Sequence, residues 1–237
     1  MTASEQHSEL PTLLLIGASR GLGHAIAARF AESGWRVIGT VRGTARTPLH
    51  ELAETSPSIE IEQLDINEPE QIRSLRQRLS ARHFDMLFVN AGTTNEHPDQ
   101  TIGEVSTEEF IRVMLTNALS PIRAVEILED LVSPDGLIGI MSSGQGSIAN
   151  NENGGREVYR GSKAALNQYM RCYAARHAGD RRALVLMAPG WIRTALGGPE
   201  APYTIEEAVP QIVNVLLAQQ GQPGLRYLDR FGNTVPW

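Results

Sequence analysis

The sequence predicts a single-domain α/β fold: a doubly wound sheet of about seven parallel strands with helices on both faces. Short apolar runs alternate with longer amphipathic stretches from one end of the chain to the other. The short runs are apolar almost throughout, which indicates strands buried on both faces, as in parallel sheets. With 237 residues, 41% of them hydrophobic, the chain is long enough for one large core, and no linker or repeat divides it.

Strands are expected where apolar and β-branched residues cluster. They are Leu13–Gly17, Arg36–Val41, Ile59–Leu64, Met86–Asn90, Leu137–Ser142, Ala183–Ala188 and Leu225–Asp229. Helices are expected where apolar residues recur with the helical period behind a polar cap. They are Gly21–Ser33, Pro69–Arg82, Thr107–Leu131, Gly155–His177 and Thr204–Gln219. In such sheets ligands bind beyond the carboxyl ends of the strands, so the functional residues are expected at that edge.

The composition of the chain argues against membranes, nucleic acids and metal ions as partners. Residues 1–10 are polar and lack the order of a secretion signal, so they are predicted to be a disordered arm before a domain at 11–237. No apolar run approaches the roughly 20 residues that span a bilayer. A net charge of −6 without a basic cluster argues against nucleic acid. We expect a cytoplasmic protein with no membrane or nucleic-acid partner. The single cysteine and the scattered histidines predict no metal site.

A glycine-rich turn, residues 17–23 (GASRGLG), follows the first predicted strand and leads directly into a helix. Glycines at these positions permit a tight turn and a close approach of the backbone to a pyrophosphate, whose charge then meets the helix N-terminus. The spacing is Gly-x-x-x-Gly-x-Gly, and a glycine pattern alone is a weak signal. Its place between strand and helix is what predicts dinucleotide binding.

The end of the second predicted strand bears on the type of cofactor. NAD-binding proteins usually place a carboxylate there on the adenosine ribose, whereas this chain has Val41, which offers no acceptor. Arg42, together with Arg20 from the glycine turn, can bind a 2′-phosphate through charge-assisted hydrogen bonds. We therefore expect NADP(H) to be preferred over NAD(H). The alternative is that both arginines are solvated surface residues.

Lys163 is the only lysine among the 21 basic residues, and it follows Tyr159 by four positions. On a helix this spacing places both side chains on one face, with Cβ atoms roughly 5–6 Å apart. A phenol with a pKa of about 10 is a poor acid or base near neutrality. One positive charge about 4 Å away lowers that pKa by about three units at an effective dielectric of about 20. The pair is therefore predicted to carry out acid–base chemistry, although a bare Tyr-x-x-x-Lys spacing also arises by accident.

Further motifs follow the predicted strands in a fixed order. They are the glycine turn, Asp65-Ile66 after the third strand, Asn90-Ala91-Gly92 after the fourth, Asn117 in a long helix, Ser142-Ser143 after the fifth, Tyr159 with Lys163, and Pro189-Gly190 after the sixth. In this order and spacing, residues 11–237 closely resemble the short-chain dehydrogenase/reductase family. The resemblance implies a Rossmann-type fold and an NADP-dependent oxidoreductase that interconverts a ketone or aldehyde and its alcohol.

The same resemblance implies the role of each residue. Tyr159 would donate the proton in carbonyl reduction, and Ser143 would bind the substrate oxygen. Lys163 would bind the nicotinamide ribose and lower the pKa of Tyr159, while Asn117 would order a water between Lys163 and solvent. The implied catalytic residues are Asn117, Ser143, Tyr159 and Lys163. The implied cofactor-binding residues are Gly17, Ser19, Arg20, Gly21, Leu22, Gly23, Arg42, Asp65, Ile66, Asn90, Ala91, Gly92, Tyr159, Lys163, Pro189, Gly190, Ile192 and Thr194.

Two features depart from the family's pattern. Tyr159 follows Ser143 by sixteen positions, more than in many relatives, because residues 148–156 add an Asn/Gly-rich loop. Ser143 best fits the family's Ser-x-x-Gly turn, and Ser142 and Ser147 remain alternatives. The segment usually found as a substrate lid, Ala195–Tyr203, is short. This predicts an open pocket and modest selectivity among ketones or aldehydes.

Finer motifs look like the branch of C-factor and the sniffer-type carbonyl reductases. They are Ser147-Ile148, Gly154-Gly155, residues 189–194 and the ending Gly232–Trp237. The branch leaves a second function open, a signalling or regulatory protein that binds NAD(P) with little turnover. An epimerase or dehydratase is disfavoured because such relatives usually carry a longer substrate domain. A homodimer, a homotetramer and a monomer all remain open, since family members pair through the helices at 107–131 and 155–177 whereas the branch includes monomers.

Overall fold

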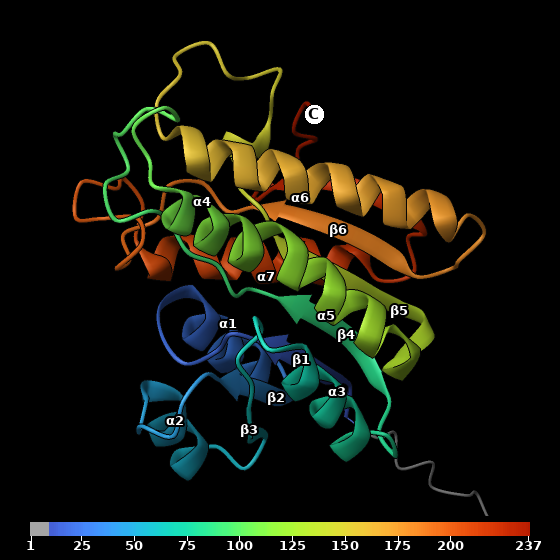
Figure 1. The fold of residues 1–237 in the computed structure, drawn as a ribbon. Helices are drawn as coiled ribbons and strands as arrows, with labels where there is room; N and C mark the ends of the chain where they lie inside the picture. The colour runs from blue at the N-terminus through green and yellow to red at the C-terminus, as the bar shows by residue number, and fades with distance from the viewer. Residues whose placement is uncertain (1–9) are drawn as a thin grey trace, which may run out of the picture.

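The computed structural model describes residues 10–237 and contains one seven-stranded sheet (Figure 1). The strand order is β3-β2-β1-β4-β5-β6-β7, and every neighbouring pair is parallel. Helices cover both faces, so the predicted doubly wound Rossmann-type fold is confirmed. The predicted disordered arm lies outside the described residues except for Leu10, which is exposed.

The elements alternate between strand and helix over most of the chain. The strands are β1 (Thr12–Ile16), β2 (Arg36–Val41), β3 (Ile59–Gln63), β4 (Phe84–Val89), β5 (Val132–Met141), β6 (Ala183–Ala188) and β7 (Gly224–Asp229). The helices are α1 (Gly21–Glu32), α2 (Pro48–Thr55), α3 (Pro69–Arg78), α4 (Thr107–Met114), α5 (Ser120–Leu128), α6 (Glu157–Arg176) and α7 (Ile205–Gln219). Within residues 10–237, no helix combines the length and apolarity needed to cross a bilayer.

Successive strand residues supply two hydrophobic layers, one on each face of the sheet. Leu14, Ile38 and Leu87 stand side by side in neighbouring strands and pack beneath α3, α5 and α6. Leu13 and Val37, one residue earlier, contribute to the layer beneath α1, α2 and α7. This alternation is the period-two geometry of strands. Because both layers are apolar, the strands read as continuous hydrophobic runs in the sequence.

The helix predicted over residues 107–131 is interrupted in its middle. A π-helical segment, Leu115–Leu119, joins α4 to α5 and contains Asn117. Pro121, in the first turn of α5, has no N–H to donate to the carbonyl of Asn117 four residues earlier, so the regular α-helical pattern cannot continue through it. Such segments are frequent at functional sites. Here the interruption leaves the Asn117 side chain in the interior.

Other boundaries also differ from the predictions. The sequence patterns missed α2, whose only fully buried residue is Leu49. The helix predicted from Gly155 begins at Glu157, because Gly154, Gly155 and Arg156 all have positive φ. The strand predicted from Leu137 begins five residues earlier, with an irregular register against β4. None of these differences moves the carboxyl ends of the strands.

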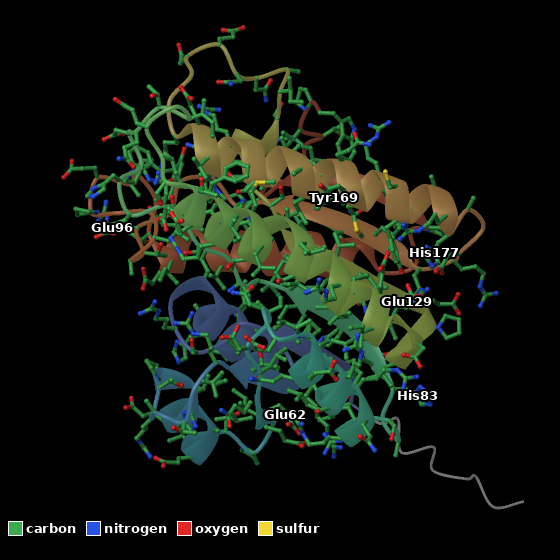
Figure 2. All side chains as sticks on the ribbon, viewed as in Figure 1. Glu62, His83, Glu96, Glu129, Tyr169 and His177 are labelled. Carbon is green, nitrogen blue, oxygen red and sulfur yellow. The ribbon has the colours of Figure 1, made fainter. Side chains whose placement is uncertain are left out.

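The two ends of the sheet carry different kinds of residues. Figure 2 shows Glu129 and His177 together where α5 and α6 end, and Glu96 on the loop beyond β4 at the opposite, carboxyl edge. His177 Nε2 lies 3.5 Å from Glu129 Oε2. The predicted cofactor and catalytic residues lie at the carboxyl edge or on the helix starts beside it.

Candidate active site

The glycine turn after β1 is held from both sides by close contacts. Gly17 has a φ of +89°, and a Cβ there would lie 2.8 Å from the backbone nitrogen of Ala91. A Cβ on Gly23 would lie 2.0 Å from the carbonyl oxygen of Gly17. Asn90 Nδ2 donates to that same oxygen over 2.8 Å, which ties the turn to the end of β4. Side chains at positions 17 and 23 are therefore excluded by the packing of the turn itself.

The outer side of the turn is open. Gly21, the first residue of α1, has a φ of +57°, and a Cβ built on it meets no atom within 4 Å. Ser19 and Leu22 beside it are half-buried. The first N–H groups of a helix have no carbonyl partner within the helix, and they favour anions. The residues present therefore fit the pyrophosphate of a dinucleotide.

Both arginines predicted to bind a 2′-phosphate are exposed beside this turn. Arg20 precedes the first residue of α1, and Arg42 follows β2. Among residues 10–237 neither forms an ion pair. Val41 is buried and Thr40 Oγ1 accepts the N–H of Gly17 over 2.9 Å, so the end of β2 offers no carboxylate to a ribose. This donor set fits a phosphate.

The residues predicted on the adenosine side follow β3 and β4. Asp65 is half-buried and its Oδ1 accepts the N–H of Asn67 over 3.0 Å. Ile66 is buried, Ala91 is half-buried and Gly92 is exposed. The strand order places the ends of β3 and β4 on the same edge as the glycine turn. Their contact with a cofactor stays a prediction.

The first turns of α6 bring the predicted catalytic pair to the end of β5. Lys163 is buried, its Nζ donates to the carbonyl oxygen of Met141 over 2.9 Å, and it lies 5.9 Å from the centre of the Tyr159 ring. The side chain of Ser143, on the turn after β5, lies close enough to Tyr159 to lower the pKa of its phenol. Three of the four predicted catalytic side chains thus come together from α6 and the turn after β5.

Burial dominates the titration of this pair. Burial raises the pKa of Tyr159, while the neighbouring Ser143 side chain and the charge of Arg156 act to lower it. Burial lowers the pKa of Lys163 to about 8. The expectation that Lys163 lowers the pKa of Tyr159 is therefore wrong here: its ammonium bonds Met141, and Arg156 is the cation that acts on the phenol. Tyr159 is accordingly protonated at neutral pH, which is the form that donates a proton.

Asn117 is fully buried and joins the loop after β4 to α6. Its Oδ1 accepts the N–H of Thr93 over 2.8 Å, and its Nδ2 donates to the Thr93 carbonyl and to Ser162 Oγ over 2.8 and 2.9 Å. A Cβ built on Gly92 would lie 3.4 Å from Asn117 Oδ1 and 3.6 Å from Lys163 Nζ, so the two side chains are neighbours. A water between Lys163 and solvent stays a prediction.

The three candidate serines have different surroundings. Ser142 is buried, and its Oγ donates to Asn167 Oδ1 over 2.6 Å. Ser147 is also buried, and its Oγ accepts the N–H of Asn150 over 3.1 Å. Ser143 is half-buried, its Oγ accepts the N–H of Gln145 over 3.1 Å, and it is the serine close enough to Tyr159 to affect the pKa of the phenol. The geometry therefore favours Ser143 as the serine that can reach a substrate oxygen beside the phenol.

The turn after β6 is held by an arginine that the sequence patterns did not single out. Arg230 is buried, and it donates to the carbonyl of Pro189 over 3.3 Å and to Gln211 Oε1 over 2.9 Å. Its guanidinium lies 3.8 Å from the centre of the Tyr203 ring. Gly190 has a φ of +91°, and a Cβ there would lie 2.3 Å from Arg230 Nη1. The shape of this turn therefore depends on both residues.

The short lid borders an open pocket of about 380 Å³. Ile192 is buried and pairs with Tyr203, while Thr194 Oγ1 accepts the N–H of Gly197 over 3.0 Å. Trp191 is 49% exposed and its Nε1 donates to the Gly197 carbonyl over 2.6 Å. The pocket is lined by Pro98, Asp99, Gln145, Arg156, Trp191, Gly197, Gly198, Pro199 and Glu200. A second open pocket, of about 420 Å³, lies entirely on the loop His97–Glu104 and includes none of the predicted catalytic residues.

Four residues that support the site were missed from the sequence. Ser162 donates to the carbonyl of Tyr159 over 2.8 Å, and its place inside the Tyr-x-x-x-Lys motif was the available signal. Arg156 follows two glycines directly before the motif. Tyr227, which donates to the carbonyl of Ser143, and Arg230 have no local signal. Both reach the site from β7 or the turn after it, far along the chain.

Known proteins share this fold and these motifs. The sequence matches the short chain dehydrogenase family over residues 11–202. C-signal of Myxococcus xanthus is 31% identical over 168 residues, which cover 70% of this chain and 100% of C-signal. A short-chain dehydrogenase/reductase of Burkholderia multivorans, solved with bound NADP, has a TM-score of 0.96 at 65% identity, covering 97% of this chain and 100% of that chain.

Carbonyl reductase Sniffer of D. melanogaster has a TM-score of 0.85 at 25% identity, again covering 97% of this chain and 100% of that chain. The similarities to C-signal and Sniffer confirm the resemblance to that branch. The match to the family covers most of the strands and helices, including the glycine turn and the Tyr159–Lys163 pair. The chain belongs to the short-chain dehydrogenase/reductase family of oxidoreductases.

Proposed function

We propose that this protein is an NADPH-dependent carbonyl reductase that also catalyses the reverse alcohol oxidation. The observation that carries the proposal is the convergence of Ser143, Tyr159 and Lys163 at the end of β5, beside an open pocket. A protein that only binds a nucleotide has no need of a half-buried phenol next to a serine side chain and a buried lysine. At neutral pH Tyr159 is in the form that donates a proton to a carbonyl oxygen, because burial raises the pKa of its phenol.

The cofactor-binding residues are assigned from the open side of the glycine turn and the residues beside it. Gly21 and the first N–H groups of α1 would hold the pyrophosphate, and Arg20 and Arg42 the 2′-phosphate. The preference for NADP(H) rests on these two guanidinium groups, which form no ion pair within residues 10–237, and is supported by the NADP-bound relative. When bound, NADPH supplies a hydride to the carbonyl carbon of the substrate.

The chain's own residues orient the carbonyl and supply the proton. Ser143 Oγ donates to the substrate oxygen and stabilises the negative charge that develops there. Tyr159 then gives its phenolic proton to that oxygen, so the carbonyl becomes an alcohol. Lys163 replaces or shares its bond to Met141 when it binds the nicotinamide ribose, and Asn117 keeps the first turn of α6 in place through Ser162. The substrate is a small ketone or aldehyde. The protein is expected to act in the cytoplasm.

The similarity to C-signal supports a second candidate, a regulatory protein that binds NAD(P) with little turnover. One assay separates the two. NADPH consumption is followed by absorbance with a panel of ketones and aldehydes, for the wild type and Tyr159→Phe. We expect the substitution to reduce turnover by about 10²–10⁴-fold, the usual contribution of a positioned proton donor. Equal rates for the two proteins, or no consumption by the wild type with any carbonyl, would favour the regulatory candidate.

A further inference from the structure

The pocket beneath the short lid has a cationic wall next to the proposed proton donor. Gln145 and Arg156 line it, and both touch the catalytic residues: the Gln145 N–H donates to Ser143 Oγ over 3.1 Å, and the Arg156 guanidinium lies 5.8 Å from the centre of the Tyr159 ring. A substrate whose carbonyl oxygen lies between Ser143 and Tyr159 therefore places its neighbouring atoms within reach of Arg156. Gln145 and Arg156 therefore connect the pocket to the predicted catalytic residues.

Arg156 adopts an unusual backbone conformation. Its φ is 51° and its ψ 42°, and within the described part of the chain it is the one residue other than glycine with a positive φ. A left-handed conformation costs a residue with a Cβ about 1–3 kcal/mol, and glycine would avoid that cost. Gly154 and Gly155 directly before it show that this loop uses glycine elsewhere. The cost of an arginine in this left-handed conformation is best explained by a function of the Arg156 side chain.

Two buried polar atoms in this wall have no partner in the described part of the chain. They are Arg156 Nε, a donor, and Gln145 Oε1, an acceptor. Unpaired buried polar groups are rare, because each costs about 1–3 kcal/mol. Arg156 also forms no ion pair with any residue between 10 and 237. The site thus presents one planar cation and one acceptor that a ligand can satisfy.

The other charges in the pocket lie at its rim. Asp99 and Glu200 are both exposed, so water screens their repulsion of an anion. Arg156 is half-buried and closer to the chemistry. Trp191 adds a flat apolar wall on the lid side. The charge arrangement therefore attracts an anion inward to Arg156 and away from the rim.

We propose that the substrate of this site is an oxo acid, a carbonyl compound with a carboxylate on the next carbon or the one after it. Arg156 binds the carboxylate, and Gln145 Oε1 accepts a hydrogen bond from a hydroxyl or N–H group of the same molecule. The inference rests on the proposed carbonyl reductase function. In the reaction, hydride adds to the carbonyl carbon and Tyr159 protonates its oxygen, so an oxo acid, NADPH and a proton give a hydroxy acid and NADP⁺. The carboxylate takes no part in bond making; it orients the carbonyl.

The test compares a charged and a neutral substrate of the same shape, benzoylformate and its methyl ester. The variant is Arg156→Asn, because asparagine tolerates the left-handed backbone and removes only the cation. We expect the ratio of kcat/KM for acid over ester to fall about 10–100-fold, the loss of a charge-assisted hydrogen bond, mainly through the KM of the acid. Arg181→Gln, which removes an exposed arginine on the turn before β6, should leave the ratio unchanged.

A second pair of variants probes the rim. Asp99→Asn and Glu200→Gln each remove one negative charge, and both should raise the acid-to-ester ratio by about twofold at low salt and less at high salt. The proposal is overturned if the wild type prefers the ester, or if Arg156→Asn slows acid and ester equally, which would assign Arg156 to the chemistry of Tyr159 alone.

A binding measurement separates this inference from the proposed function. Mandelate, the hydroxy acid product, is titrated into the NADP complex of the wild type and of Arg156→Asn by calorimetry. Weaker binding to the variant supports carboxylate recognition even if no carbonyl consumes NADPH, in which case only the reductase function fails. Equal affinities for the two proteins, alongside normal reduction of the ester, overturn the oxo acid proposal and leave the reductase function standing.

Discussion

Two tyrosines on α6, one half-buried and one fully buried, have different surroundings. Tyr173 is fully buried, its hydroxyl donates to Glu129, and its ring stacks on His177 with 4.1 Å between centres. Burial and the Glu129 carboxylate raise its pKa. Tyr159 lies fourteen residues earlier, about 21 Å along the helix axis, and neighbours Ser143 and Arg156 beside an open pocket.

The difference lies in what holds the proton. A phenol that donates to a carboxylate has a fixed partner, and Tyr173 thereby fastens the end of α6 to α5. Among residues 10–237 no carboxylate acts on the phenol of Tyr159, and the positive charge of Arg156 lies nearby, so its proton is available to a substrate. The same residue type thus serves stability at one end of the helix and chemistry at the other.

Replacing Lys163 by Met should reduce activity at the Tyr159 end of α6 without lowering the stability of the protein. We expect turnover to fall about 10²–10³-fold, because the nicotinamide ribose loses its cationic donor. The free energy of unfolding should rise by about 1–2 kcal/mol at pH 7, since burial lowers the pKa of Lys163 to about 8 and a buried ammonium therefore opposes folding. Chemical denaturation of both proteins measures the second effect.

The difference in unfolding free energy between the wild type and Lys163→Met should depend on pH, because folding lowers the pKa of Lys163. Between pH about 8 and the ordinary value of 10.5, the unfolded chain keeps the proton on Lys163 more readily than the folded chain. Wild-type stability relative to Lys163→Met should therefore increase as pH rises through this window. A difference that stays constant from pH 7 to 10 would contradict the assignment of a buried charge.

Arg42→Ala tests the nucleotide-binding edge. We expect the KM for NADPH to increase about 10–100-fold while that for NADH stays the same, because the lost bond is to the 2′-phosphate. Steady-state kinetics with each nucleotide gives the comparison. Arg73→Ala, which removes an exposed arginine of α3, is the matched control and should alter neither KM. An equal increase with both nucleotides would show that Arg42 does not select NADP(H).

Tyr227→Phe extends the comparison of Tyr159 and Tyr173 to a third tyrosine, which supports the site through the backbone of Ser143. Its hydroxyl donates to the carbonyl of Ser143, and removing it leaves that oxygen without this donor. We expect kcat to fall about two- to fivefold with little change in the nucleotide KM, and unfolding free energy to fall by about 1 kcal/mol. A stability loss with unchanged kcat would limit Tyr227 to a structural role.

Regular patterns made most of the fold predictable. Parallel strands buried on both faces read as apolar runs, and glycines at turns with positive φ marked where the helices begin and end. The short helix α2 escaped because eight residues with one fully buried side chain give too little periodicity. Its Thr47-Pro48 start, with a capping interaction at His50, was the readable signal.

The candidate site was predictable where its residues belong to local motifs. Tyr159 and Lys163 needed only a helical spacing, and the glycine turn only its place between β1 and α1. The π-helical segment at Asn117 escaped because helical period alone does not reveal one extra residue in a turn. The contact of Tyr227 with Ser143 spans 84 positions, and such pairs leave no trace in a single sequence.

The matched pair Tyr159→Phe and Tyr173→Phe tests most directly whether Tyr159 is the proton donor. The measurement is the single-turnover rate of NADPH oxidation with a reducible carbonyl, together with the free energy of unfolding of each variant. The account predicts a rate loss of about 10²–10⁴-fold for Tyr159→Phe at nearly wild-type stability, and a wild-type rate for Tyr173→Phe with about 1–2 kcal/mol lower stability. Equal rates for the two variants would contradict it.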